Sequence, residues 1–114
     1  MHELSIAMDM IEMAEETAKR EGMSLVAGIV VRVGTLSGVD PDALEMVFPM
    51  AAENTLCAGA VLTIKKVAAT VFCRQCARET AAEYPFGVCS ECGSSDTDVR
   101  SGREMIIQSL ELRE

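Results

Sequence analysis

Two Cys-x-x-Cys pairs place the strongest constraint on how this chain folds. Cys73 pairs with Cys76 and Cys89 with Cys92, and a spacer of 12 residues separates the two pairs. Each pair bends the backbone so that two sulfur atoms face one ion at about 2.3 Å, and the spacer lets the two turns meet. Because the only histidine is His2, near the amino terminus, the sequence predicts a closed, all-thiolate metal site.

A closed four-thiolate site leaves no open position for water or substrate, so we expect a structural zinc ion. The same four ligands also suit an iron site of the rubredoxin type, and paired cysteines can serve as a dithiol redox centre. Cys57 lies outside the pattern. We expect it to be a small buried or loop residue, because no neighbouring base would make it a nucleophile.

The charge of the chain narrows the choice of partners. Its 114 residues are enough for one small domain and a metal-stapled module, and the formal net charge is −8. Such a chain repels phosphate backbones, so we expect no nucleic-acid partner, although cations or a basic protein would be attracted. No segment approaches the roughly 20 apolar residues of a membrane span, and no signal peptide is visible. We therefore expect a cytoplasmic protein whose thiols bind metal.

The first third of the chain predicts one helix and one strand. Gly22 is a plausible stop for the helix, and the segment from Leu25 to Val33 is rich in Val and Ile, as strands are. The helix is predicted because apolar residues recur at three- and four-residue steps: Leu4, Ala7, Met8, Ile11, Ala14 and Ala18.

A second helix is predicted to begin after Asp40 and Pro41, which suit the N-cap and first helical position. Pro49 predicts a kink or an early break in this helix. We expect Met8, Met46 and Met50 to be packing residues and not soft-metal ligands. The residues expected to face inward are Leu44, Val47, Phe48 and Ala51.

Two further strands are predicted on either side of the cysteine module, from Val61 to Val67 and from Met105 to Leu112. In the last strand Gln108 interrupts the alternation of Ile107, Ser109 and Glu111 with Ile106, Leu110 and Leu112. The predicted class is α+β. A domain of about two helices and a three-stranded sheet (1–68 and 100–114) carries an inserted zinc ribbon (69–99).

The amino terminus offers a second and different metal site. The amine of Met1, the backbone amides that follow and the imidazole of His2 can wrap Ni(II) or Cu(II) in a tetragonal plane. Glu3 and, if the fold brings it close, Asp40 could add oxygen ligands or hold the ligands in place. Each residue also has a simpler interpretation: a surface histidine, an acid in the first helical turn, and a helix cap.

Three segments of the chain resemble the HypA/HybF nickel metallochaperones. They are the start Met1-His2-Glu3-Leu4-Ser5, the loop from Val33 to Pro41, and the paired Cys-x-x-Cys motifs. Pro49 departs from the family pattern, in which this helix usually carries apolar and acidic residues. The resemblance covers essentially the whole chain.

The resemblance implies that His2 is the essential nickel ligand, helped by the amine of Met1, with Glu3 and Asp40 in support. It also implies that Cys73, Cys76, Cys89 and Cys92 hold a structural zinc ion. Family members pass nickel to the large subunit of nickel–iron hydrogenase together with a GTPase partner, and some also serve urease. The resemblance therefore predicts a nickel carrier and not an enzyme.

Two rival functions are weaker. A zinc-ribbon adaptor or nucleic-acid module without nickel transfer needs a basic face. A metal-dependent hydrolase or redox enzyme needs an open metal position or an activated thiol, and no motif for either is found. The arginines of the cysteine module are outnumbered by acids: Arg74, Arg78 and Arg100 against Glu79, Glu83, Glu91, Asp96 and Asp98.

Overall fold

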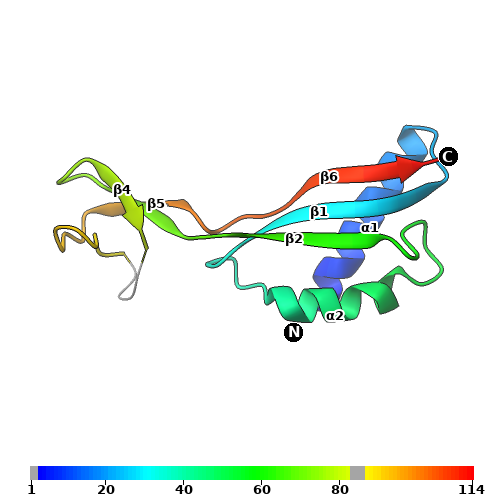
Figure 1. Ribbon diagram of the computed structural model, residues 1–114, viewed down its shortest axis with the longest axis horizontal. Coiled ribbons are helices and arrows are strands. Elements are labelled where there is room, and N and C mark those ends of the chain that lie inside the picture. The colour runs from blue at the N-terminus through cyan, green and yellow to red at the C-terminus, as the bar shows by residue number, and fades with distance from the viewer. Residues whose placement is uncertain (1–2, 83–86) are drawn as a thin grey trace.

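The computed structural model of the chain describes residues 3–82 and 87–114. It shows an elongated molecule, 53 × 27 × 16 Å along its principal axes, with one three-stranded sheet towards each end (Figure 1). Both helices lie beside the first sheet, and the two Cys-x-x-Cys pairs lie in or beside the second sheet. The predicted α+β class is confirmed. Among the described residues, no helix is long and apolar enough to cross a bilayer.

The order of elements follows the sequence pattern closely. The predicted bounds of the first two strands agree with β1 and β2 to within one residue. The elements are α1 (Glu3–Arg20), β1 (Leu25–Gly34), α2 (Pro41–Ala52), β2 (Val61–Val67), β3 (Thr70–Cys73), β4 (Arg78–Ala81), β5 (Thr97–Ser101) and β6 (Met105–Arg113).

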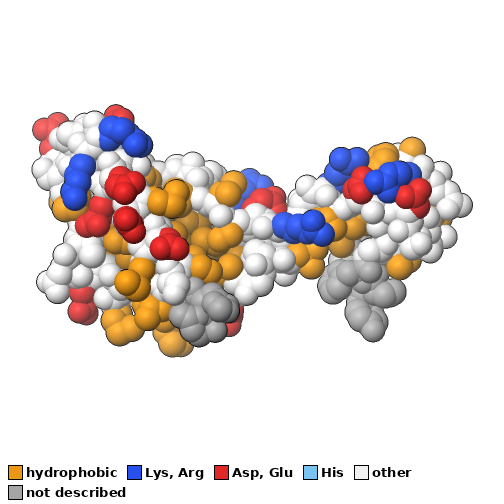
Figure 2. Space-filling view, turned by 180° about the vertical axis from the view of Figure 1, so that it is seen from behind, with side chains coloured by type: hydrophobic (Ala, Val, Ile, Leu, Met, Phe, Trp, Pro, Cys, Tyr) orange, Lys and Arg blue, Asp and Glu red, His pale blue; other side chains and the backbone are white. Residues whose placement is uncertain are grey.

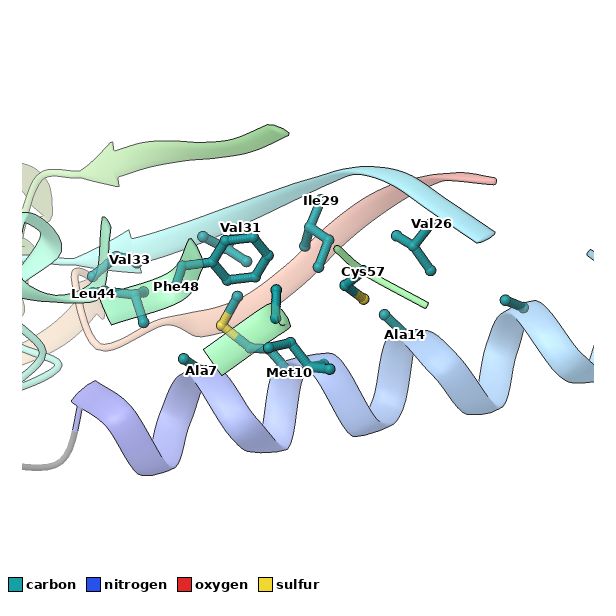
Figure 3. Packing of buried hydrophobic residues seen from close by; sticks show 13 residues of the cluster. Ala7, Met10, Ala14, Val26, Ile29, Val31, Val33, Leu44, Phe48 and Cys57 are labelled. Atoms are coloured by element: carbon teal, nitrogen blue, oxygen red, sulfur yellow. The ribbon is translucent and has the colours of Figure 1, made fainter. Parts of the chain in front are cut away.

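The first sheet has the strand order β2-β1-β6, with β1 parallel to β2 and antiparallel to β6. Helix α2 forms the crossover that a parallel pair requires. In Figure 1, α1 lies behind this sheet and α2 runs along its lower side. Both helices pack against one face of the sheet, because their buried side chains share a single cluster with those of β1 (Figure 3).

The core of the first sheet combines branched strand residues with small helix residues (Figure 3). Ala7 and Ala14 of α1 are fully buried, and their small side chains let the helix approach β1 closely. Leu44 and Phe48 of α2 are buried as predicted. The strand residues of this core are Val26, Ile29, Val31 and Val33.

Several residues expected in the core are exposed. Leu4 and Met8 are 37% and 57% exposed, whereas Met10 is buried. Met46 and Met50 are 79% and 61% exposed, so none of the three methionines expected to be packing residues lies in the core. Met46 follows the buried Leu44 by two residues, about 200° around the helix, and therefore points away from the core. Figure 2 shows exposed hydrophobic side chains on the helix side of the molecule.

Pro49 does not end α2, which continues to Ala52. Of the two outcomes expected for Pro49, a kink or an early break, the early break was wrong. The proline ring removes one backbone donor near the end of the helix. Phe48 and Ala52, on either side of it, are both buried and hold the last turn against the core.

A β-bulge changes which residues of β6 face the helices. Val30 pairs with Ser109 and Val31 with Ile107, so Gln108 is an extra residue on β6. A bulge of this kind moves the following side chains to the other face. The predicted grouping of Ile106 with the core-facing residues was therefore wrong, because Ile106 is 50% exposed. The residues that pack on the core are Met105, Ile107, Leu110 and Leu112.

The two sheets are joined by a neck, which consists of residues 68–69 and 102–104 (Figure 1). Glycine is required there because the backbones nearly touch. A Cβ atom on Gly34 would lie 2.0 Å from the carbonyl oxygen of Gly102, and one on Gly102 would lie 2.6 Å from Cα of Ala69. The N–H of Leu36 donates to the same carbonyl of Gly102 at 2.6 Å, which fixes its position.

Candidate metal sites

The four predicted cysteines come together at one end of the second sheet. Cys73 ends β3, Cys76 lies in the turn to β4, and Cys89 and Cys92 lie in the loop before β5. All four sulfur atoms lie within 4.8 Å of one another. The Sγ atoms of Cys73 and Cys92 are 3.6 Å apart, and those of Cys76 and Cys89 are 3.7 Å apart. Four sulfurs at about 2.3 Å from one ion are about 3.8 Å apart, so the cluster fits tetrahedral zinc.

Hydrogen bonds from backbone amides lower the pKa of two of these cysteine thiols and so favour their thiolate forms. The N–H groups of Cys92 and Glu91 donate to Cys89 and lower its pKa to about 6, and the Glu91 contact is 3.4 Å long. The N–H of Cys76 likewise lowers the pKa of Cys73. Desolvation and the neighbouring sulfurs raise the pKa of Cys76 to about 12. A divalent cation is therefore needed to keep all four groups as thiolates.

Side-chain contacts close the second sheet around the cysteines. Arg74 forms ion pairs with Asp96, at 2.6 Å, and with Asp98, and its backbone N–H donates to the carbonyl of Asp96. These contacts tie the first cysteine pair to the segment that follows the second pair. The guanidinium of Arg100 lies 4.8 Å from the ring centre of Phe72. Both arginines are therefore engaged within the sheet.

The second predicted site lies at the start of α1. Met1 and His2 fall outside the described residues. Glu3 is the first residue of α1, and its Oε2 accepts the backbone N–H of Asp40 at 3.1 Å. This donation lowers the pKa of Glu3, so its carboxylate stays charged. Glu3 and Asp40, which are far apart in sequence, are thus neighbours beside the amino-terminal end of α1.

Asp40 also has a structural task. It is the N-cap of α2, and its Oδ1 accepts the backbone N–H groups of Asp42, at 3.0 Å, and Ala43, at 3.4 Å. The loop before it is fixed by a bond from the Val39 N–H to the hydroxyl of Ser37 and by Gly38, whose φ is +82°. The cap interpretation of Asp40 is confirmed. The sequence analysis placed Glu3 and Asp40 in one predicted site on the condition that the fold brings them close, and the fold does so. The hydrogen bond between them was not foreseen.

Cys57 is fully buried in the core of the first sheet, as the sequence analysis expected (Figure 3). Burial, with some contribution from the charge of Glu15, raises the pKa of its thiol to about 11. The carboxylate of Glu15 accepts the backbone N–H of Leu56 at 3.0 Å and so joins α1 to the loop after α2. Sequence reasoning missed Glu15, whose position on the polar side of α1 suggested only a solvated acid.

The fold and the cysteine cluster together define a small α+β metalloprotein with a closed zinc-type site at one end. The chain belongs to the HypA family: a family model described as "Hydrogenase/urease nickel incorporation, metallochaperone, hypA" matches residues 1–112. This is a family of nickel metallochaperones in hydrogenase maturation, and the resemblance found in the sequence is confirmed.

Curated relatives and solved structures agree with this assignment. A hydrogenase maturation factor HypA from Nostoc sp. is 39% identical over the whole chain and 97% of the relative, and that of Chlorobium limicola is 35% identical over the whole chain and 98% of the relative. The solution structure of the nickel metallochaperone HypA from Helicobacter pylori has a TM-score of 0.71 and 30% identity. That comparison covers 99% of this chain and 98% of the Helicobacter chain. A second solution structure of a HypA protein has a TM-score of 0.73 and 29% identity, with 98% and 96% covered.

Proposed function

We propose that this chain binds Ni(II) at its amino terminus and delivers it during the maturation of nickel–iron hydrogenase. The observation that carries the proposal is the Met-His-Glu start of a chain that matches a nickel metallochaperone family along almost its whole length. The contact between Glu3 and Asp40 supports it, because this contact holds the first helical turn against a fixed loop. The ligands before Glu3 then have a rigid base.

In this proposal His2 supplies the imidazole, and Met1 supplies the terminal amine. Backbone amides complete a plane that suits Ni(II). Glu3 and Asp40 belong to the same site as supports, and their carboxylates add the negative charge that attracts a cation. Protons compete for the amine and the amides, so acid favours release of the metal. An exposed terminus also lets an acceptor replace the ligands one at a time.

We further propose a division of labour along the chain. Residues 1–68 and 100–114 form the nickel-binding domain, and residues 69–99 form the zinc-ribbon domain, with the second boundary inside β5. The main buried cluster supports this division, because its described members all lie between Ala7 and Cys57. The zinc ion is structural, since its four thiolates leave no position for an incoming ligand.

The acceptor in this proposal is the hydrogenase large subunit, with a GTPase of the nickel-insertion pathway and, in some settings, urease maturation proteins as further partners. The description of the family names both hydrogenase and urease. Neither an enzymatic activity nor nucleic-acid binding is part of the proposal, because the chain is acidic and its thiolate site is closed. We place this activity in the cytoplasm, where thiols stay reduced and can bind zinc.

A nickel titration tests the proposal. Untagged protein with its native amino terminus is titrated with Ni(II) by calorimetry and absorbance, beside His2→Ala and a variant with one residue added before Met1. Zinc content is measured on the same samples, and Lys19→Ala, an exposed residue of the same helix, is the control. We expect about one equivalent of tightly bound nickel in the native and control proteins. We expect the other two to lose it while they keep zinc.

Two results would contradict the proposal. Equal nickel binding by all the proteins would exclude the amino terminus as the site. Binding only with displacement of zinc would place nickel on the thiolates. In either case the chain would be better described as a zinc-ribbon adaptor.

A further inference from the structure

The face of the first sheet that points away from the helices carries three rows of side chains, which follow from the strand register. We call this surface the open face, and α1 lies behind it in Figure 1. From the far end towards the neck the rows are Val61, Gly28 and Glu111; then Thr63, Val30 and Ser109; and then Lys65, Arg32 and Ile106.

The open face is unusual because it includes a parallel pair of strands. Parallel sheets are generally covered on both faces, whereas antiparallel sheets commonly leave one face in water. Here β1 and β2 are parallel, yet Val61 is 67% exposed and Ile106 is 50% exposed. Branched apolar side chains of this kind gain free energy when a second layer covers them.

A hollow of about 250 Å³ lies at the far end of this face. It forms because Gly28 has no side chain, while Thr63 and Ser109 are small and Val61 and Glu111 form the walls. A water molecule takes about 30 Å³ of the liquid, so the hollow has room for one long side chain. It also has a charged wall, since the side chain of Glu111 is 60% exposed, with its carboxylate 2.6 Å from the guanidinium of Arg113.

The charges on the open face differ between its two ends. Lys65 and Arg32 lie at the neck end, whereas the far end carries Glu111 beside the hollow, paired with Arg113 of the same strand. A two-fold axis parallel to the strands would place Arg32 of one copy against Arg32 of the other. The alternative is a two-fold axis that lies between the two sheets, parallel to their planes and perpendicular to the strands, at the row of Val30. This axis places each Arg32 over the Gly28 of the second copy and within reach of its Glu111.

We propose that two copies of this chain pack open face to open face in this second arrangement. Each Arg32 enters the hollow of the other copy and pairs with Glu111, and each Lys65 packs its stem on Val61. Within one chain Arg32 pairs with Glu104 at 3.8 Å and Glu111 pairs with Arg113 at 2.6 Å. All four side chains are exposed or partly exposed, so the contact between the copies forms by exchange of these pairs. Sheets that pack face to face lie about 10 Å apart, a gap that these side chains span.

The size of the open face sets the strength of this dimer. Ten residues of β1 and three strands give a face of about 33 Å by about 14 Å, which is small for a specific interface. The dimer is therefore reversible and forms at high protein concentration. Both helices, and with them the start of α1, lie on the opposite side of the sheet and stay accessible.

Sedimentation velocity on untagged, zinc-loaded, full-length protein tests the proposal at concentrations from about 10 µM to about 1 mM. We expect Arg32→Glu and Glu111→Lys each to weaken dimerisation by about tenfold or more, and the double variant to restore most of it. Gly28→Leu fills the hollow and weakens the dimer without a change of charge. Lys19→Glu, which makes the same charge change as Arg32→Glu on the helix side, leaves the dimer intact.

Circular dichroism and zinc content show that each variant is folded before it is compared. All of the substituted side chains are exposed or partly exposed, and a Cβ at Gly28 meets only ordinary contacts at 3.6 Å. A protein that is monomeric at the highest concentration overturns the proposal. So does a dimer that Arg32→Glu and Gly28→Leu leave unchanged, or a double variant without recovery.

Discussion

Gly34 and Gly28 lie on the same strand, yet the structure gives them opposite tolerance for a side chain. A Cβ on Gly34 would lie 2.0 Å from a backbone oxygen, whereas one on Gly28 meets nothing closer than 3.6 Å. We expect Gly34→Ala to lower the free energy of unfolding by about 3 kcal/mol, because backbone at the neck must move. Gly28→Ala is the matched control and should be nearly neutral. Urea unfolding of both variants measures the difference in the free energy of unfolding. Equal unfolding midpoints would show that the backbone of the neck can move at little cost and would contradict the prediction.

The buried thiol of Cys57 gives a prediction about alkaline pH. Its pKa rises from the ordinary value of 9.0 to about 11 in the folded chain. The unfolded chain therefore loses this proton first, so the stability due to the thiol is complete below pH 9 and disappears as the pH rises towards 11. We expect Cys57→Ala to reduce this alkaline loss of stability. Urea unfolding at neutral and alkaline pH, in both proteins, checks it. Parallel pH profiles would indicate that the thiol ionises as easily in the folded state.

At the scale of an element, α2 depends on its cap. Asp40→Ala removes the acceptor for two backbone N–H groups, and we expect it to cost about 1 kcal/mol of stability. Asp40→Asn keeps a side-chain oxygen and should cost little. The pair also separates the two roles of this residue when nickel affinity is measured. If Asn retains stability but loses nickel affinity, the carboxylate contributes to the nickel site; if it retains both, Asp40 acts as a cap.

Elements also show where sequence reasoning succeeded and where it failed. The strands β1 and β2 and the cap of α2 were predictable, because local residue patterns specify them. The faces of β6 were not, since the bulge at Gln108 depends on its pairing with β1. The methionines of α1 and α2 look like core residues by type alone. Their exposure is decided by which side of each helix meets the sheet.

In the candidate sites, too, some features were predictable from local sequence motifs and others depend on the fold. Cys-x-x-Cys spacing is a local signal, and the cysteine cluster was predictable from it. The contact of Glu3 with Asp40, and the bond from Leu56 to Glu15, join segments that lie far apart in sequence. No periodicity or motif in the sequence predicts these hydrogen bonds. Gly34 and Gly102 carried a weaker signal, because glycines often mark close approaches of backbone without showing what approaches.

At the scale of the whole molecule, we expect removal of zinc to unfold the second sheet and to leave the first sheet and both helices folded. Among the described residues, the second sheet buries few apolar side chains besides two cysteines, and Val71 is one of them, whereas the first sheet and both helices have their own core. We expect a strong chelator to unfold residues 70–101 while the helical circular dichroism signal remains. Amide spectra by nuclear magnetic resonance locate the change. Cys73→Ser should reproduce it and Cys57→Ser should not, and a loss of helical signal on chelation would contradict this prediction.

The neck also bears on how fast the chain folds. β6 pairs with β1 only after the segment between Val67 and Met105 has been brought back on itself. As a flexible loop this segment has roughly 37 residues, but a zinc-bound second sheet holds its two ends together and leaves only the roughly five residues of the neck loose. By the logarithmic dependence of loop closure on length, that lowers the entropic cost of closing the first sheet by about 2 kcal/mol. A metal ion bound at one end of the molecule should therefore favour the pairing of the strand that completes the other end.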